Sequence, residues 1–108
     1  MIHLTADTQI MIAIAPADFR CGIDGFVARC HKQLNQDAKS GILYVFINRR
    51  KTMVRALVYD GTGYWLMTKR LSKGKFKGWP KSSASLCNVV ARQLRALLTN
   101  NDENWIKT

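Results

Sequence analysis

Residues 42–71 read ILYVFINRRKTMVRALVYDGTGYWLMTKRL, and this stretch decides the fold. The run Ile42–Ile47 is continuously apolar and rich in β-branched and aromatic residues, which is typical of a strand buried on both faces. Met53–Tyr59 and Tyr64–Leu71 predict two further strands, separated by the turn signal Asp-Gly-Thr-Gly. Connections this short join antiparallel neighbours, because parallel strands need a crossover of about a dozen residues or more. The stretch therefore predicts an antiparallel β-meander.

Weaker patterns flank the meander. Gln9–Ala15 is rich in Ile and stops at a proline, which predicts a first short strand at a sheet edge. Apolar residues recur at helical spacing over the following segment, and we expect a helix over Asp24–Gln36 with Asp24 capping its first turn. After the meander, Phe76–Trp79 is a candidate for a short last strand, which the next proline would stop.

The last third of the chain carries a second helical pattern. Six apolar residues mark one face of a helix and two arginines mark the other: Leu86, Val89, Val90, Leu94, Leu97 and Leu98 against Arg92 and Arg95. Ser83 or Ser85 is placed to cap its start, and Asn100 or Asn101 its end. We expect one α+β domain over residues 1–108, an antiparallel β-meander of about four to five strands packed against two helices, with a flexible tail from near residue 102.

Positive charge is concentrated in one part of the chain. Asn48–Lys81 holds ten Lys or Arg and one acid, Asp60, whereas the other 74 residues hold seven Lys or Arg and six acids. Nearly all of the formal charge of +10 comes from this stretch, an imbalance that indicates an anion-binding surface. We expect nucleic-acid binding by Arg49, Arg50, Lys51, Arg55, Lys69, Arg70, Lys73, Lys75 and Lys77.

These basic residues fall on two turns and on the strands between them. The turns at Arg49–Lys51 and Lys73–Lys77 are free to converge, and arginine forks match phosphate oxygens. Lys69 and Arg70 are consecutive in a strand and must point to opposite faces, so the whole set cannot form one flat patch. A second interpretation stays open, in which charges at turns only protect the sheet edges. Without a basic recognition helix, we expect DNA contact that is non-specific or weakly specific.

Aromatic residues lie among these cations. They could stack on the bases of a single strand. Aromatic side chains also favour strands for packing alone, and we expect that role for Tyr59, Tyr64, Trp65 and Trp79.

We find no catalytic or metal-binding constellation in the sequence. Asp18, Asp24 and Asp60 each flank a glycine-containing turn, where aspartate is expected for capping. The single glutamate, Glu103, leaves little for acid–base catalysis. Chelating spacing is absent from the cysteines and histidines, which are Cys21, Cys30, Cys87, His3 and His31. We therefore expect no enzyme activity, no cofactor and no metal.

The same residues indicate the compartment. An odd number of cysteines without CxxC pairing favours reduced thiols over disulfides. No apolar run approaches the roughly 20 residues of a membrane span. Because the first ten residues also lack the basic start and apolar centre of a signal peptide, we expect the cytoplasm and no membrane association.

The segment 16–25, PADFRCGIDG, is dense in Gly and Asp and predicts a loop of fixed geometry. Asp18 and Arg20 are two residues apart and are expected to fix the loop by an ion pair or hydrogen bonds. Gly22 and Gly25 complete this candidate structural or partner-binding loop, because loops of fixed geometry commonly carry binding.

Several motifs together resemble a known family, the TnpB-type or Orf2-like accessory proteins encoded beside the transposase in insertion sequences of the group numbered 66. Asp18–Gly25 matches the pattern D-x-R-x-G-x-x-G. The other matching positions, in order, are Ser40–Phe46, Arg49-Arg50, Arg55–Asp60, Gly63, Lys69–Leu71, Gly74, Phe76, Trp79-Pro80, Gln93-Leu94 and Leu97-Leu98. The sequence departs from the family pattern at Val58-Tyr59, where the family has a tryptophan pair.

The resemblance implies a bacterial mobile-element protein that accompanies the transposase and is not the transposase itself. Two hypotheses follow. In the first, the chain is a non-catalytic module that assists transposition by binding DNA through its basic hairpins. In the second, it is an adaptor that docks on the transposase or a sister accessory protein without binding DNA itself. Self-association into a homo-oligomer is left open.

Overall fold

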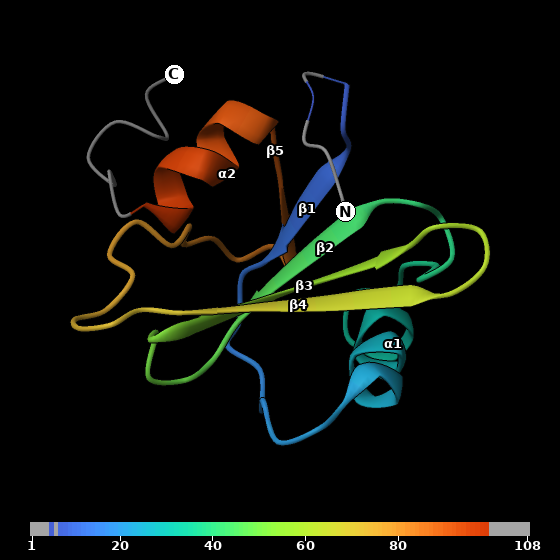
Figure 1. Cartoon of the computed structure of the whole chain (residues 1–108), viewed down its shortest axis with the longest axis horizontal. Helices are drawn as coiled ribbons and strands as arrows, with labels where there is room; N and C mark the ends of the chain where they lie inside the picture. Colours follow the sequence, from blue (N-terminus) through green and yellow to red (C-terminus); the bar gives the residue numbers. More distant parts are fainter. Residues whose placement is uncertain (1–4, 6, 100–108) are drawn as a thin grey trace.

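The computed structural model describes residue 5 and residues 7–99 (Figure 1). Within these residues, five strands form one sheet in the order β4-β3-β2-β1-β5, and two helices accompany it. The elements are β1 (Ile10–Ala13), α1 (Ile23–Lys32), β2 (Leu43–Ile47), β3 (Met53–Tyr59), β4 (Tyr64–Arg70), β5 (Leu86–Val89) and α2 (Ala91–Leu98). The α+β class predicted from the sequence is confirmed.

The predicted meander forms the larger part of the sheet. β2, β3 and β4 pair antiparallel in sequence order, and all five residues of β2 are buried. Side chains alternate between the two faces of the pleat, so Val54 and Leu57 of β3 belong to different cores. The continuous apolar run of β2 is explained by its position, because both of its faces are covered.

β1 occupies a different position from the predicted one. It was expected at a sheet edge, but it lies between β2 and β5 and pairs parallel with β2. Residues 14–42, which contain α1, supply the long crossover that a parallel pair requires. Burial of Ile10 and Ile12 at 2% and 0% exposure fits this interior position.

The C-terminal pattern was partly misread as helix. Leu86–Val89 forms the strand β5, antiparallel to β1, and the helix begins only at Ala91. Neither Ser83 nor Ser85 caps it, because Gln93 Oε1 accepts the N–H of Val90 at 2.9 Å. Its C-cap is Thr99. The predicted C-terminal caps, Asn100 and Asn101, and the predicted tail from residue 102 lie outside the described residues.

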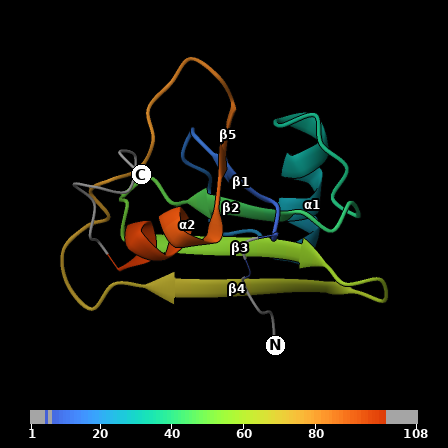
Figure 2. The ribbon, with the colours of Figure 1, turned by 90° about the horizontal axis from the view of Figure 1, so that it is seen from above.

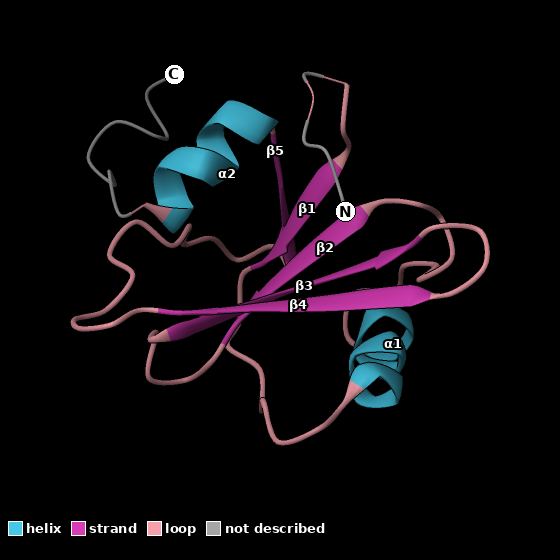
Figure 3. Cartoon of the chain, in the orientation of Figure 1, coloured by secondary structure: helices cyan, strands magenta, loops and turns pink. Residues whose placement is uncertain are grey.

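The predicted last strand, Phe76–Trp79, is a loop whose two end residues are buried. Both of its aromatic ends are anchored: the Phe76 N–H donates to the Lys51 carbonyl at 2.8 Å, and Trp79 Nε1 donates to the Ala13 carbonyl at 3.0 Å. Figure 3 shows this long connection between β4 and β5 as loop. Side-chain burial, with Phe76 and Trp79 only 2% and 5% exposed, replaces the strand ladder that the pattern predicted.

α1 also differs from its prediction at both ends. It begins after Gly22, so Asp24 lies inside the first turn and does not cap it. It ends at Lys32, before the predicted end at Gln36, because Asn35 takes a left-handed conformation with φ of 53°. The N–H of Gln36 then donates to the Cys30 carbonyl at 2.8 Å and closes the helix end.

The two helices cover opposite faces of the sheet (Figures 1 and 2). α2 packs Leu94 and Leu97 onto the face that carries Leu43 and Val45. α1 packs on the other face, which carries Tyr44 and Phe46; its own contributions are Phe26 and Cys30. Alternate residues of β2 thus enter two separate cores, and the fold has three layers.

Candidate nucleic-acid interface

The turn between β2 and β3, residues 48–52, is named here the basic tip. The Asn48 side chain closes it: its Oδ1 accepts the N–H groups of Thr52 and Met53 at 2.9 and 3.1 Å, and its Nδ2 donates to Thr52 Oγ1. Lys51 takes a φ of 61°, and its N–H donates to the Asn48 carbonyl. This ordered turn leaves Arg49 and Arg50 exposed.

The loop that leads into α1 lies directly beside the basic tip. The Ala17 N–H donates to the Ile47 carbonyl at 2.8 Å, and Ala17 forms a parallel bridge with Asn48. The next residues therefore continue alongside the arginines of the tip. This neighbourhood joins segments that are about 30 residues apart in sequence, a distance over which local patterns carry no information.

Within that loop, the predicted ion pair between Asp18 and Arg20 is present. Arg20 Nη2 lies 2.7 Å from Asp18 Oδ2, and the Arg20 N–H donates to Asp18 Oδ1 at 2.9 Å. These hydrogen bonds hold the pKa of the Asp18 carboxyl well below its usual range. The Arg20 side chain is nevertheless 91% exposed, so its cation stays accessible.

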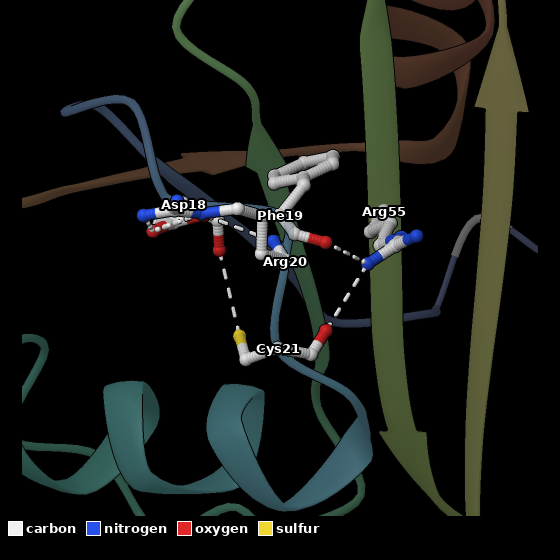
Figure 4. A network of polar contacts seen from close by, with 5 residues as sticks. All are labelled: Asp18, Phe19, Arg20, Cys21 and Arg55. Atoms are coloured by element: carbon white, nitrogen blue, oxygen red, sulfur yellow. Dashed lines mark hydrogen bonds and ion pairs between the residues drawn. The ribbon is translucent and has the colours of Figure 1, made fainter.

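Arg55 fixes the same loop from the sheet. Its Nη1 donates to the carbonyls of Phe19 and Cys21 at 2.8 and 3.3 Å, as Figure 4 shows. Its Nε donates to Thr68 Oγ1 at 2.9 Å, and its guanidinium lies over the Phe19 and Phe26 rings. The structure therefore uses Arg55 to hold the loop to β3.

The loop and the basic tip together enclose an open hollow of about 470 Å³. Among the described residues, four arginines and one carboxylate line it, together with Ala17, Phe19, Asn48 and Met53. The arginines are Arg20, Arg49, Arg50 and Arg55, and the carboxylate is Asp18. Because Asp18 is already bonded to Arg20, the hollow keeps an excess of positive charge. Such a hollow suits an anion with several oxygens, such as a phosphodiester.

A second hollow, of about 540 Å³, borders Lys51 of the basic tip. Lys51 and Lys81 supply its cations, and Ser82, Ser83 and Ser85 supply hydroxyl groups. Residues 14–16 line this hollow and Ala17 lines the first, so one short segment borders both. Residues of the basic tip thus line both hollows, Arg49 and Arg50 the first and Lys51 the second.

The remaining predicted binding residues lie in three places. Lys69 faces α2, where its Nζ donates to the Leu98 carbonyl at 2.7 Å at the helix C-terminus. Arg70 is exposed at the end of β4. The turn with Lys73, Lys75 and Lys77 is drawn toward the basic tip, because Leu71 and Phe76 donate N–H groups to the carbonyls of Thr52 and Lys51.

The aromatic residues mostly pack, as expected. Trp79 is buried, and the rings of Tyr59 and Tyr64 contact each other with centroids 5.0 Å apart. Trp65 is 47% exposed, and its Nε1 donates to Asp60 Oδ2 at 2.8 Å. Asp60 also accepts from the backbone N–H groups of Thr62 and Gly63, and these bonds lower its pKa to about 2.

The acidic and thiol groups are placed for structure. Among residue 5 and residues 7–99, no three His, Cys, Asp or Glu side chains gather as a metal site requires. His3, one of the residues considered for zinc, lies outside the described part. Burial raises the pKa of the Cys30 thiol to about 12, which disfavours the reactive thiolate. Neither α1 nor α2 has the length or the apolar character that crossing a membrane would require.

Sequence reasoning missed two contributors to this surface. The sequence predicts that Arg20 fixes the loop, and it places Lys81 in the basic stretch without predicting that it binds nucleic acid. Both were visible as cations, but only the contact between Ala17 and Asn48 and the buried anchor at Trp79 bring them beside the basic tip. Those are tertiary contacts, which residue spacing does not encode.

Fold and surface define a class: a small basic α+β protein in which arginines surround an ordered turn between two strands. The chain belongs to the family described as IS66 Orf2 like protein, whose family model matches residues 8–107. Membership in this family implies an accessory protein of a bacterial insertion sequence, and the family is not a known enzyme family.

Two curated relatives come from Sinorhizobium fredii (strain NBRC 101917 / NGR234). The chain is similar to "Uncharacterized protein y4hO", with 31% identity over 113 residues that cover 100% of this chain and 97% of the relative. It is also similar to "Uncharacterized protein y4jC", with 40% identity over 76 residues, 70% of this chain and 65% of the relative. No solved structure matches the chain significantly.

Proposed function

We propose that this protein assists transposition by binding the phosphate backbone of nucleic acid at the basic tip and its two hollows. The observation that carries the proposal is the grouping of Arg20, Arg49 and Arg50 around one hollow. Asp18, the only carboxylate among the described residues that line it, is already paired. Guanidinium groups bind phosphate oxygens in pairs, and release of counterions from the backbone drives such binding.

The order of the basic tip favours this role. The hydrogen bond that Asn48 Oδ1 accepts from the Thr52 N–H and the left-handed backbone conformation of Lys51 fix the turn before a ligand arrives. Binding therefore costs less conformational entropy. Arg49 and Arg50 are exposed, and among the described residues neither has an ion-pair partner to give up before it contacts a phosphate. Backbone contact of this kind fixes position on nucleic acid without reading its sequence.

The helices are not arranged as recognition helices. α2 has eight residues and turns its Leu94 and Leu97 into the core, and α1 turns Phe26 and Cys30 into the opposite core. Sequence-specific proteins commonly place a helix in the major groove with several side chains at the base edges. Binding that is non-specific or weakly specific is therefore the expected mode.

A salt series tests the proposal. Fluorescence anisotropy with a labelled duplex and a labelled single strand should show affinity that falls as salt rises, with a slope of about −0.9 per phosphate contact on the duplex. Replacing Arg49 and Arg50 together by Gln should flatten that slope by up to about two. Absence of salt-dependent binding to both probes at low salt would reject DNA binding.

A matched control uses two lysines at the other end of β2. Lys32 and Lys39 precede β2 in the chain, whereas the basic tip follows it. The side chains of the two lysines are exposed. The variant Lys32→Gln/Lys39→Gln changes net charge by the same amount. It should keep the wild-type slope, because the phosphates are not expected to reach that end. An equal loss in both variants would indicate only a general charge effect.

One observation favours the second function, an adaptor for the transposase or a sister accessory protein. The loop 18–22 is fixed by Arg20 and Arg55, and it leads into Ile23, which is 39% exposed at the start of α1. A fixed loop with an exposed apolar residue suits protein contact. If the transposase copurifies with wild type and not with Ile23→Glu, and if the salt series shows no DNA binding, the adaptor function replaces the first.

A further inference from the structure

β4 ends the sheet, and within the described residues no strand pairs with its outer edge. The ladder fixes which groups point outward. The Leu71 N–H donates to the Thr52 carbonyl and the Asp60 N–H to the Gly63 carbonyl, so alternation directs the backbone of Trp65, Met67 and Lys69 toward β3. The N–H and C=O groups of residues 64, 66, 68 and 70 therefore point away from the sheet.

An exposed apolar strip adjoins this edge. Trp65 and Met67 are 47% and 37% exposed, and they stand opposite Val58 and Ala56 of β3 on the face that α2 covers only in part. Beside Met67 an apolar hollow of about 200 Å³ opens between the sheet and Leu94 and Leu98 of α2. An open strand edge next to exposed apolar side chains is a surface that proteins usually cover.

We propose that a second copy of this chain covers it, with β4 of each copy paired antiparallel around Met67. The sequence of β4 makes the strand complementary to itself in this orientation. One half of β4 is aromatic, Tyr64-Trp65, and the other half is cationic, Lys69-Arg70. Antiparallel pairing sets each cationic half against the aromatic half of the other copy, an attractive arrangement. Parallel pairing would align cations with cations.

Hydrogen bonding selects the register. With Met67 opposite Met67 of the second copy, residue 64 faces residue 70 and residue 66 faces residue 68, so all four outward-pointing residues of each strand form hydrogen-bonded pairs. A shift by two residues leaves one of the four without a partner, and a shift by one matches outward groups with inward ones. In this register Trp65 lies opposite Lys69 of the second copy.

The proposal does not depend on DNA binding, and salt separates the two. Each copy carries a formal charge of +10, so repulsion opposes the dimer and added salt should strengthen it. Phosphate binding should weaken over the same range. Sedimentation of wild type at concentrations up to several hundred micromolar should show a shift from 12.3 kDa toward twice that mass as salt rises.

Cysteine crosslinking tests the register. In a non-hydrogen-bonded antiparallel pair the two Cα atoms are about 4.5 Å apart, within disulfide range, so Met67→Cys should form a covalent dimer on mild oxidation. The matched variant Trp65→Cys places its two cysteines about 14 Å apart and should crosslink no more than wild type. Equal crosslinking of both variants, or a wild type that stays at 12.3 kDa in high salt, overturns the proposal.

Discussion

The guanidinium of Arg55 holds the backbone of Phe19, which lies 36 residues earlier in the chain. Arg55 Nη1 donates to the Phe19 carbonyl at 2.8 Å, and the guanidinium carbon lies 5.1 Å from the centre of the Phe19 ring. A strand residue that looked like part of a basic surface therefore ties the loop before α1 to the sheet. Positions of Asp18 and Arg20, and with them one wall of the first hollow, depend on this contact.

We predict that Arg55→Ala lowers the free energy of unfolding by about 1.5–3 kcal/mol, the range for hydrogen bonds made by charged groups. Hydrogen exchange should increase at residues 18–22 before it increases in β2, because the loop loses its fixed point. Arg70→Ala is the control, since Arg70 lies on an exposed strand end. Urea unfolding measures both variants, and an equal, small effect in the two would contradict the structural role of Arg55.

Gly25 is required by packing inside α1. A Cβ at this position would overlap the Cβ and Sγ atoms of Cys21. Helix propensity alone predicts that Gly25→Ala stabilises the protein by about 1 kcal/mol. We predict the opposite sign, a loss of about 1–3 kcal/mol, because overpacking exceeds the gain in propensity. Gly63→Ala is the control, since nothing lies within 4 Å of the added Cβ and the backbone there is not left-handed, and its unfolding midpoint should stay near that of wild type.

Trp65 of β4 and Trp79 of the connection between β4 and β5 should differ in how much each stabilises the fold. Trp79 is 5% exposed and donates to the Ala13 carbonyl, whereas Trp65 is 47% exposed. Trp79→Phe leaves that carbonyl without its partner and a space in the core, so it should cost about 1–3 kcal/mol. Trp65→Phe should cost less than about 1 kcal/mol. Thermal unfolding of the two variants checks the difference, and similar melting temperatures would contradict it.

The lowered pKa of Asp60 predicts how the stability of the fold depends on pH. Its pKa in the folded protein is lowered to about 2 from 3.8 by hydrogen bonds from Thr62, Trp65 and Gly63. A carboxyl with a lowered pKa stabilises the fold above its unfolded pKa, and this contribution is lost as pH falls from about 4 to 2. Wild type should therefore lose its advantage over Asp60→Asn across that window, in urea midpoints measured from pH 7 to pH 2.

Asp7→Asn supplies the control for net charge, because it makes the same charge change at an exposed residue before β1, far in sequence from the turn. If the difference between wild type and Asp60→Asn stays constant from pH 7 to pH 2, the hydrogen bonds of Asp60 do not act through its charge.

The meander was predictable because every signal for it is local. Alternation, the apolar run of β2 and the turn at residues 60–63 all lie within one continuous stretch. β5 was missed because residues 86, 89 and 90 fit a helix period, while pairing with β1 decides their conformation. Helix ends failed for a similar reason: the left-handed Asn35 ends α1 before the apolar pattern ends.

The charged residues of the candidate site could be predicted from the sequence, but the contacts that bring them together could not. Arg49 and Arg50 were recognisable from the charge imbalance, and the ion pair of Asp18 with Arg20 from their spacing. The two segments that carry these residues are joined by the bridge between Ala17 and Asn48. This bridge depends on the parallel pairing of β1 with β2, which brings the end of β1 to the end of β2. The inward role of Arg55 was hidden too, because its acceptors are backbone carbonyls of a distant loop.

Opposite charge changes within the first hollow should have opposite effects on binding to DNA. Arg20→Gln removes a cation whose side chain is 91% exposed and should flatten the salt slope by about one. Asp18→Asn removes the carboxylate that lines the hollow in the described part of the chain and should strengthen binding at low salt, because Arg20 is freed from its ion pair. Asp60→Asn makes the same charge change at the turn between β3 and β4, at the far end of β3 from the basic tip. Its affinity should match that of wild type, so a similar gain in both aspartate variants would show that net charge, and not the hollow, governs binding.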